Sequence, residues 1–272
     1  MRIGIIAGGG QFPALFAKAA KAAGYMVVAA AHRSETAADL GEYVDAIEWV
    51  HLGQLKKIIR FFKKHEVAQA VMMGSITKTR LFTDLRPDIK AVALLAGMRH
   101  TLDDGILRAV AGAMEKDGIA IKASTFLMPE LLAPEGCWTR RRPGASEISD
   151  MAVGWRIAKE IGHLDIGQCV VVAGGSVLAV EAIDGTDATI ARGGRLGNGQ
   201  AVVVKVCKPN QDFRFDVPAL GAQTVASMVA AGASALAVEA DRTVVFDRAD
   251  MVAAADAAGV SIVAFSGPPK TR

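Results

Sequence analysis

The stretch RIGIIAGGGQFPALFAKAAKAAG, residues 2–24, decides the fold of this chain. It opens with a short apolar run of the kind that forms a buried strand, and three glycines follow. From Phe12 onward, Leu15, Phe16 and Ala19 recur at the spacing of one helix face. The stretch therefore predicts a strand, a tight turn and a helix, which is the opening of a βαβ unit.

The same alternation continues through the first half of the chain. Apolar runs and helical spacings predict strands at 25–31, 68–73 and 119–123, and helices at 52–65 and 104–117. A βαβαβ order predicts a parallel sheet covered by helices, with ligands gathering at the carboxyl ends of the strands. We expect a Rossmann-like N-terminal domain over residues 1–132.

The pattern breaks after Leu132, where two prolines, a glycine and Arg140-Arg141-Arg142 replace the apolar periodicity. We place a linker at 133–145 and a C-terminal α/β domain at 146–272. Its predicted elements are helices at 150–161, 221–231 and 248–258, a hairpin of 169–173 with 177–183, and strands at 201–206, 235–238, 243–246 and 261–265. The sequence thus predicts two α/β domains, the second with a mixed sheet.

Composition narrows the class of protein. The 51% hydrophobic content is rich in alanine, and no run reaches the roughly 18 to 20 apolar residues that a spanning helix needs. A net charge of +3 with dispersed basic residues gives no nucleic-acid footprint. Cys137, Cys169 and Cys207 form no Cys-x-x-Cys pair, which is typical of inert thiols in a reducing compartment. We expect a soluble, cytoplasmic protein; peripheral contact with a membrane stays open.

The turn Gly8-Gly9-Gly10-Gln11 is a candidate phosphate site. Glycines let backbone approach a phosphate, and the N-terminus of the following helix favours anions. Pro13 replaces the third glycine of the dinucleotide fingerprint, and the second strand ends in Ala31-His32-Arg33 without the carboxylate that binds ribose. NAD is therefore disfavoured. A plain βα turn with Pro13 in the first helical turn is the structural alternative.

A second polar turn, Met73-Gly74-Ser75-Ile76-Thr77-Lys78, follows the predicted strand at 68–73. Because parallel strands share one carboxyl edge, this turn should lie beside the first glycines. Its hydroxyls and Lys78 would then face the same phosphate. A loop with a solvated lysine is the alternative.

Adjacent carboxylates, Asp103 and Asp104, precede a predicted helix that carries Arg108 in its first turns. Either carboxylate could be a helix N-cap. They could also hold a hard cation, because Mg²⁺ is typically bound by one or two carboxylates together with substrate phosphates.

The densest polar stretch runs from Glu181 through Asp184 and Asp187 to Arg192, and Lys205 and the segment 208–218 follow it. We expect more than a solvated hairpin here. Lysine and arginine can neutralise a diphosphate, while aspartate can bind a metal or orient water. The five histidines show no metal-ligand spacing, and no serine lies in G-x-S-x-G.

Four motifs in this order give the chain a strong resemblance to the alternative UDP-2,3-diacylglucosamine pyrophosphohydrolases of lipid A synthesis. They are Gly4-Ile-Ile-Ala-Gly8-Gly-Gly10-x-x-Pro13, Asp103-Asp104-x-x-Leu107-Arg108, Val177-Leu-Ala-Val-Glu181-Ala-Ile-Asp184-Gly-Thr-Asp187 and Lys208-Pro-x-Gln211-Asp212-x-Arg214-Phe-Asp216-x-Pro218-x-x-Gly221. The resemblance covers nearly the whole chain.

The resemblance implies an enzyme that hydrolyses UDP-2,3-diacylglucosamine to UMP and 2,3-diacylglucosamine 1-phosphate (lipid X). Water would attack the sugar-side phosphorus with help from Mg²⁺ or another divalent cation. We expect catalysis from Asp216, Asp212, Asp187, Lys208 and Arg214, with Asp216 and Asp187 as metal ligands. Substrate binding would fall to Gly8, Gly9, Gly10, Gln11, Gly74, Ser75, Lys78, Asp104, Arg108, Arg192, Lys205, Gln211 and Thr224.

Two other functions stay open at this point. A dinucleotide-dependent oxidoreductase would bind NAD(P) tightly, and a lipid or nucleotide-sugar carrier would close on its ligand without turnover. If both halves contribute, the site lies in a cleft between domains, where closure could exclude water and shelter acyl chains. A homo-oligomer and contact with the cytoplasmic face of the inner membrane are further expectations.

Overall fold

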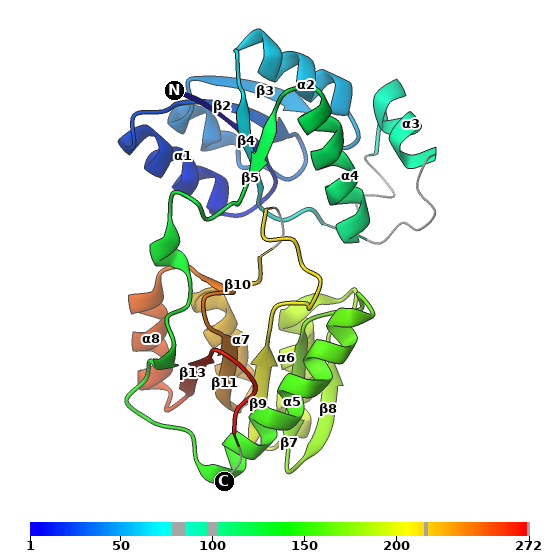
Figure 1. Ribbon diagram of the computed structural model, residues 1–272. Coiled ribbons are helices and arrows are strands. Elements are labelled where there is room, and N and C mark those ends of the chain that lie inside the picture. Colours follow the sequence, from blue (N-terminus) through cyan, green and yellow to red (C-terminus); the bar gives the residue numbers. More distant parts are fainter. Residues whose placement is uncertain (78–84, 97–102, 215–216, 271–272) are drawn as a thin grey trace. The chain divides into compact units, whose positions relative to one another are not determined.

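The computed structural model describes residues 1–77, 85–96, 103–214 and 217–270. The chain divides into two compact units (Figure 1). Unit 1 comprises Met1–Pro129 and Asp212–Asp216, and unit 2 comprises Glu130–Gln211 and Val217–Arg272. A short segment from late in the sequence therefore belongs with the N-terminal part of the chain. The domain bounds given above remain a prediction.

Unit 1 is built on a five-stranded parallel sheet in the order β3-β2-β1-β4-β5, so the predicted parallel α/β architecture is confirmed. The strands are β1 (Arg2–Ala7), β2 (Met26–His32), β3 (Ala46–Val50), β4 (Gln69–Met73) and β5 (Ala120–Lys122). The helices are α1 (Phe12–Ala22), α2 (Leu55–Lys64), α3 (Ile89–Ala96) and α4 (Asp103–Lys116), with a 3₁₀ turn η1 (Ala38–Tyr43).

Helices cover both faces of this sheet. Side chains alternate between the faces of a strand, so Ile6 of β1 points to the side where α2, α3 and α4 pack. There it joins Phe62 and Met114 in one apolar cluster. Ile5 points the other way, and α1, with its buried Phe16, packs on β1 and β2. This packing holds the carboxyl ends of β1 and β4 in place.

Unit 2 is built on a six-stranded sheet in the order β6-β13-β11-β9-β7-β8. The sheet is mixed, which confirms the prediction of a mixed sheet for this half. Strands β9, β11 and β13 are parallel, while β7 and β8 form the predicted antiparallel hairpin. The elements are η3 (Pro129–Leu131), β6 (Gly136–Cys137), α5 (Ala145–His163), β7 (Cys169–Ala173), β8 (Ser176–Val180), α6 (Gly185–Leu196), β9 (Ala201–Lys205), β10 (Ala219–Leu220), α7 (Ala222–Ala231), β11 (Ala233–Glu239), β12 (Val244–Val245), α8 (Arg248–Ala257) and β13 (Ser261–Phe265).

Helix α6 was not predicted, because its sequence GTDATIARGGRL is polar and rich in glycine. Strand β8 ends at Val180, and the chain turns into a helix five residues later. The helix buries Ile190 and the face formed by Gly193 and Gly194. Packing against the sheet therefore outweighs the low helix propensity of these glycines.

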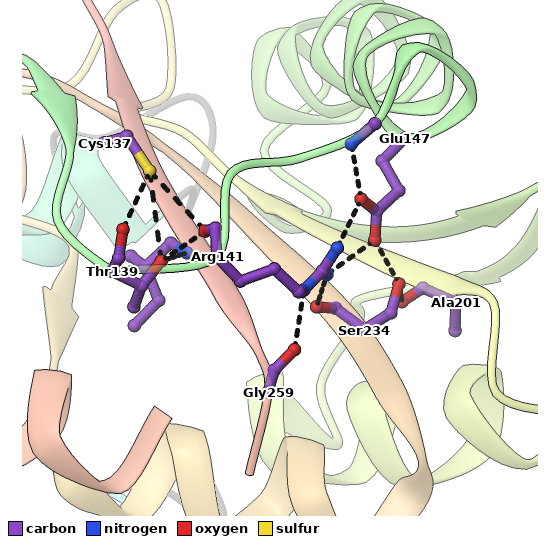
Figure 2. Close-up of polar contacts among 9 residues, drawn as sticks. Cys137, Thr139, Arg141, Glu147, Ala201, Ser234 and Gly259 are labelled. Atoms are coloured by element: carbon purple, nitrogen blue, oxygen red, sulfur yellow. Dashed lines mark hydrogen bonds and ion pairs between the residues drawn. The ribbon is translucent and has the colours of Figure 1, made fainter. Parts of the chain in front are cut away.

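The segment at 133–145 is part of unit 2, and a polar network holds it against the rest of that unit (Figure 2). The Arg141 guanidinium pairs bidentately with Glu147 at 2.8 and 2.9 Å and donates to the carbonyl oxygens of Ser234 and Gly259. Glu147 also accepts hydrogen bonds from the Ser234 hydroxyl and the Gly144 amide. Burial opposes ionisation of Glu147, but these donors outweigh it and lower its pKa to about 2.

Among the residues that the structure describes, no helix has both the length and the apolar character needed to cross a bilayer.

Candidate functional site

Two glycine-containing turns of unit 1 meet at the carboxyl edge of its sheet. The Gly8 amide donates to the Met73 carbonyl oxygen at 2.8 Å, and Gly9 and Ser75 exchange hydrogen bonds of 2.7 and 3.1 Å. These bonds join the turn after β1 to the turn after β4. The predicted proximity of the two turns is therefore confirmed.

The contact is close enough to require glycine on both sides. A Cβ on Gly8 would lie 2.6 Å from the Ser75 carbonyl oxygen, and one on Gly74 would lie 2.6 Å from the Gly9 carbonyl oxygen. Gly74 also has a φ of +88°, which side chains rarely adopt. The glycines thus serve backbone-to-backbone packing first, and that packing fixes the position of Gly10 and Gln11, which are exposed beside it.

The strand order makes this edge a topological switch point. The chain leaves β1 for β2 on one side and later returns to β4 on the other. In open α/β sheets, ligands bind in the crevice at such a point. Helix α1 begins there at Phe12, with Gln11 as its N-cap, so its positive dipole end faces the same edge. The geometry suits a phosphate.

The end of β2 adds a network that the sequence analysis did not single out. Thr36 donates to the Ala7 carbonyl oxygen at 2.7 Å, and a His32 ring nitrogen lies 2.9 Å from the same oxygen. The Glu35 carboxylate accepts hydrogen bonds from the amide and hydroxyl of Thr77. In the sequence, only their position at the end of a strand pointed to these residues. That position does not indicate which of them form hydrogen bonds with one another.

A charged cluster forms where residues 212–214 meet α4 in unit 1. Arg214 binds Asp212 at 2.8 Å and Glu115 at 2.9 Å. The hydrogen bonds from Arg214 lower the pKa of Asp212, and the positive charge of Arg108 adds to the effect. Asp212 is therefore a firmly ionised carboxylate whose oxygens are held by Arg214. The structure brings together three predicted site residues here: Arg108, Asp212 and Arg214.

In unit 2 the polar edge lies at the carboxyl end of β9. Lys205 is only 7% exposed and donates to the Ala219 carbonyl oxygen at 2.9 Å. Glu181, also buried, accepts from the Gln168 amide and the Thr186 hydroxyl. Burial raises the pKa of the Cys169 thiol, and the negative charge of Glu181 raises it further, while the positive charge of Lys205 lowers it. Glu181 and Lys205 therefore lie close enough to act on the same buried sulfur.

Helix N-termini surround this edge. Helices α6 and α7 both begin on the side where β9 ends, so their positive dipole ends favour an anion there. Asp187, in the first turn of α6, accepts a hydrogen bond from Ser227 of α7 at 3.0 Å. Thr224 is buried in the first turn of α7. Lys205, Asp187 and Thr224 thus belong to one edge.

Other predicted basic residues have structural partners. Arg192 binds Asp184 at 2.6 Å and the Val180 carbonyl oxygen at 2.9 Å, which ties α6 to the end of β8. Lys208 pairs with Asp165 at 2.5 Å. A role for Arg192 or Lys208 on phosphate would require these ion pairs to be shared or exchanged.

The loop after β9 is anchored at its start. The Gln211 side-chain oxygen accepts from the Lys208 amide at 2.8 Å and from the Cys207 thiol at 3.0 Å. The Cys207 amide donates to Glu239, which pairs with Lys159 at 2.6 Å. Gln211, which was predicted to bind substrate, therefore has a structural role at the start of this loop. The ion pair between Lys159 of α5 and Glu239 of β11 had no signal in the sequence, because its partners are eighty residues apart.

Three predicted site residues have no described side chain. Lys78 and Asp216 lie outside the described residues, and the side chain of Asp104 is likewise not described. The described part of the chain contains no cluster of three His, Cys, Asp or Glu residues around one metal position. Mg²⁺ needs fewer protein ligands when phosphates supply the rest, and the exposed Asp187 offers hard oxygen ligands of the kind it takes.

Each half of the chain matches a model of a known protein family. Residues 2–131 match the family model of the LpxI N-terminal domain, and residues 134–263 match that of the LpxI C-terminal domain. The UDP-2,3-diacylglucosamine pyrophosphatase LpxI of Caulobacter vibrioides is 33% identical over 273 residues, which cover 96% of each chain. With both of its domains matched and a relative aligned over nearly its full length, this chain belongs to the LpxI family.

Proposed function

We propose that this protein hydrolyses the pyrophosphate bond of UDP-2,3-diacylglucosamine, which releases UMP and 2,3-diacylglucosamine 1-phosphate in lipid A biosynthesis. The observation that carries the proposal is the full-length similarity to a relative named for this activity. The geometry supports it, because each unit offers a sheet edge suited to phosphate. This reaction would place the enzyme in the cytoplasm. We expect residues 1–132 and 146–272 to act as its two domains.

In unit 1 we assign phosphate binding to the paired turns. Gly8 and Gly9 pack against the second turn, and Gly10 is the open position, where a phosphate can approach the backbone. The N-terminus of α1 stabilises the charge of that phosphate. Gln11, Gly74 and Ser75 border the same edge. The backbone hydrogen bonds between the two turns hold this edge in one arrangement, which favours preorganised binding of a phosphate.

In unit 2 we assign charge stabilisation to Lys205, with the helix N-termini of α6 and α7. A buried lysine at this edge is worth more to a developing phosphate charge than an exposed one, because water screens it less. Thr224 would donate from its hydroxyl to the same phosphate. Lys208, Arg192, Gln211, Arg108 and Arg214 remain candidates for further phosphate contacts.

We propose that Asp216 positions the attacking water. Asp212, from the same sequence motif, and Asp187, from the motif before it, are the next candidates. The oxygen of water forms a bond to the sugar-side phosphorus, and the bond from that phosphorus to the bridging oxygen breaks. The bridging oxygen leaves with UMP, and the proton of water passes to a base or to solvent. Both products are thereby accounted for.

We further propose that the reaction uses a divalent cation, Mg²⁺. Asp216 and Asp187 would hold it together with the substrate phosphates. When bound, such a cation supplies positive charge that lowers the cost of the developing phosphate charge. The cation remains part of the proposal.

The test is UMP release from purified UDP-2,3-diacylglucosamine, measured with and without Mg²⁺ for the native protein, Asp216→Ala and the exposed control Asp39→Ala. We expect release by the native and control proteins in Mg²⁺, and loss in Asp216→Ala with substrate binding retained. Binding without release by the native protein would favour a carrier and overturn the proposal. Unchanged release by Asp216→Ala would keep the hydrolase and remove Asp216 from its site.

A further inference from the structure

Helix α3 of unit 1 has its apolar stripe on the outside. Ile89, Val92, Ala93 and Ala96 recur at the i, i+3, i+4, i+7 spacing of one helix face, and all four are exposed. Ile89 is 81% exposed and Val92 is 51% exposed. In a helix of a globular protein this stripe normally faces the core. Here Ala91 fills that role, so the outer stripe needs another explanation.

An open groove extends the apolar surface toward α4. It has a volume of about 470 Å³, and its lining includes Ala93 and Leu94 of α3 and Ala109 and Gly112 of α4. Lys90 and Lys116 also line it. Apolar walls with lysines beside them match the division of a lipid into acyl chain and anionic headgroup.

The neighbouring helix α2 is strongly amphipathic and its outer face is cationic. Leu55, Ile58, Ile59 and Phe62 face the core, whereas the exposed positions include Lys56, Arg60, Lys63 and Lys64. Within the described residues, no ion pair engages Lys56, Arg60, Lys64 or Lys116. Among the residues that the structure describes, the charges of these four side chains are therefore not offset by a neighbouring carboxylate.

Ion pairs and backbone contacts show that these helices share one surface. The Asp117 carboxylate binds Lys63 of α2 at 2.6 Å and also binds Lys90 of α3. Asp88, just before α3, accepts from the Lys56 amide of α2 at 2.6 Å. We call the combination of Ile89 and Val92 with Lys56, Arg60, Lys64 and Lys116 the docking face.

We propose that the docking face binds an anionic lipid bilayer. Ile89 and Val92 enter the boundary between headgroups and acyl chains, and the cationic side chains meet the headgroup phosphates. Charge selects this occupant over others, since an exposed apolar stripe bordered by cations with no ion-pair partner in the described part of the chain is complementary to anionic lipid. This proposal deepens the proposed function and rests on it, because an enzyme that cleaves a lipid must reach a membrane. Docking itself is measured without turnover.

The test is cosedimentation of the full-length protein with vesicles of phosphatidylcholine, with or without phosphatidylglycerol. We expect binding to the anionic vesicles that weakens as salt rises. Ile89→Glu/Val92→Glu should lower the partition coefficient at least tenfold, and Arg60→Ser/Lys64→Ser by roughly tenfold or more. Because these side chains are exposed, the variants should have the same unfolding temperature as the native protein.

Matched controls lie on unit 2. Leu164→Glu/Leu196→Glu changes two exposed apolar side chains, and Arg156→Ser removes an exposed charge; both should bind vesicles as the native protein does. Equal binding by Ile89→Glu/Val92→Glu and native protein would overturn the proposal. A native protein that is oligomeric without vesicles, together with a monomeric Ile89→Glu/Val92→Glu, would also overturn the proposal, because a second copy would then be the occupant of this face. UMP release from detergent-dispersed substrate needs no docking, so the docking variants should release UMP as the native protein does. This assay therefore separates failure of docking from failure of the proposed function.

Discussion

Gly9 and Ser75 exchange two backbone hydrogen bonds, of 2.7 and 3.1 Å, across the carboxyl edge of the parallel sheet. They are sixty-six positions apart in the sequence, yet this bridge joins the turn after β1 to the turn after β4. The site edge of unit 1 is therefore one rigid structure rather than two independent loops. Changes in either turn should affect both.

Replacing Gly8 with alanine should damage this edge. The new Cβ would lie 2.6 Å from the Ser75 carbonyl oxygen, so the two turns must separate. Overpacking of this kind costs about 1–3 kcal/mol, and we expect a melting temperature several degrees lower together with slower UMP release. Gly41→Ala is the matched control, because a Cβ there meets open space. Native stability in Gly8→Ala would contradict the described contact.

Replacing Lys205 with methionine should lower kcat while the protein stays folded. Lys205 is buried at the edge of unit 2, where a positive charge is least screened by water. Loss of one such group from a phosphate or oxyanion site typically costs about 10²- to 10³-fold in kcat. A methionine keeps most of the side-chain volume, although the Ala219 carbonyl oxygen loses its donor.

The Lys205→Met experiment measures kcat and KM for UMP release together with thermal unfolding. Arg195→Met is its control, because Arg195 is exposed in the last turn of α6, away from this edge. A rise in KM alone would assign Lys205 to ground-state binding rather than to charge stabilisation. An unchanged kcat would remove Lys205 from the proposed site.

The fold could be predicted from sequence because its signals are local. The apolar run at 2–7, the glycines after it and the helical spacing from Phe12 fall within one window, and each matches an element of unit 1. Strand β3 was missed for a local reason as well. Its sequence AIEWV is only partly buried, so it lacks the continuous apolar run of a central strand.

The candidate site was less predictable, because its contacts are long-range. The meeting of the two glycine turns followed from the rule that parallel strands share a carboxyl edge. The partners of the cations did not follow from any rule. Arg214 binds Glu115, and Lys208 binds Asp165, and neither pair shows in spacing or periodicity. The same positive charge in sequence can serve a substrate or a neighbouring carboxylate, and only geometry distinguishes them.

Glu147 should make stability depend on pH in the acid range. Its pKa is lowered from an ordinary 4.5 to about 2, so the native state favours the ionised form. The resulting stabilisation is fully present above pH 4.5 and is lost as the pH falls toward 2, and its upper size is roughly 3 kcal/mol. Native protein should therefore lose unfolding free energy over this window more steeply than Glu147→Gln does.

Urea unfolding of both proteins at pH 7, 5, 4 and 3 measures this difference. At pH 7 Glu147→Gln should be the less stable, since the Arg141 guanidinium loses its ionised partner. The gap should narrow as the pH falls. Glu160→Gln, on an exposed position of the same helix, should follow the native curve. A gap that stays constant from pH 7 to pH 3 would refute the lowered pKa of Glu147.

The unpredicted helix α6 provides a final test, in which one substitution type should have opposite effects at two sites. In Gly193→Ala the new Cβ would lie 2.5 Å from the Val171 Cβ, so α6 must move off the sheet at a cost of about 1–3 kcal/mol. In Gly112→Ala of α4 the Cβ meets nothing within 4 Å, and the better helix propensity should add up to about 1 kcal/mol.

Denaturant unfolding of the two variants separates packing from propensity, because both place alanine inside a helix. Val171→Ala supplies a further check, since it removes two of the three atoms that the Gly193→Ala side chain would meet. The double variant should therefore be less destabilised than the sum of its single changes, with a coupling energy above the roughly 0.5 kcal/mol seen for independent sites. Strict additivity would mean that the two Val171 methyl groups do not contribute to the clash. Because Asp187 lies in the first turn of the same helix, Gly193→Ala should also slow UMP release from detergent-dispersed substrate, whereas Gly112→Ala should leave that release unchanged.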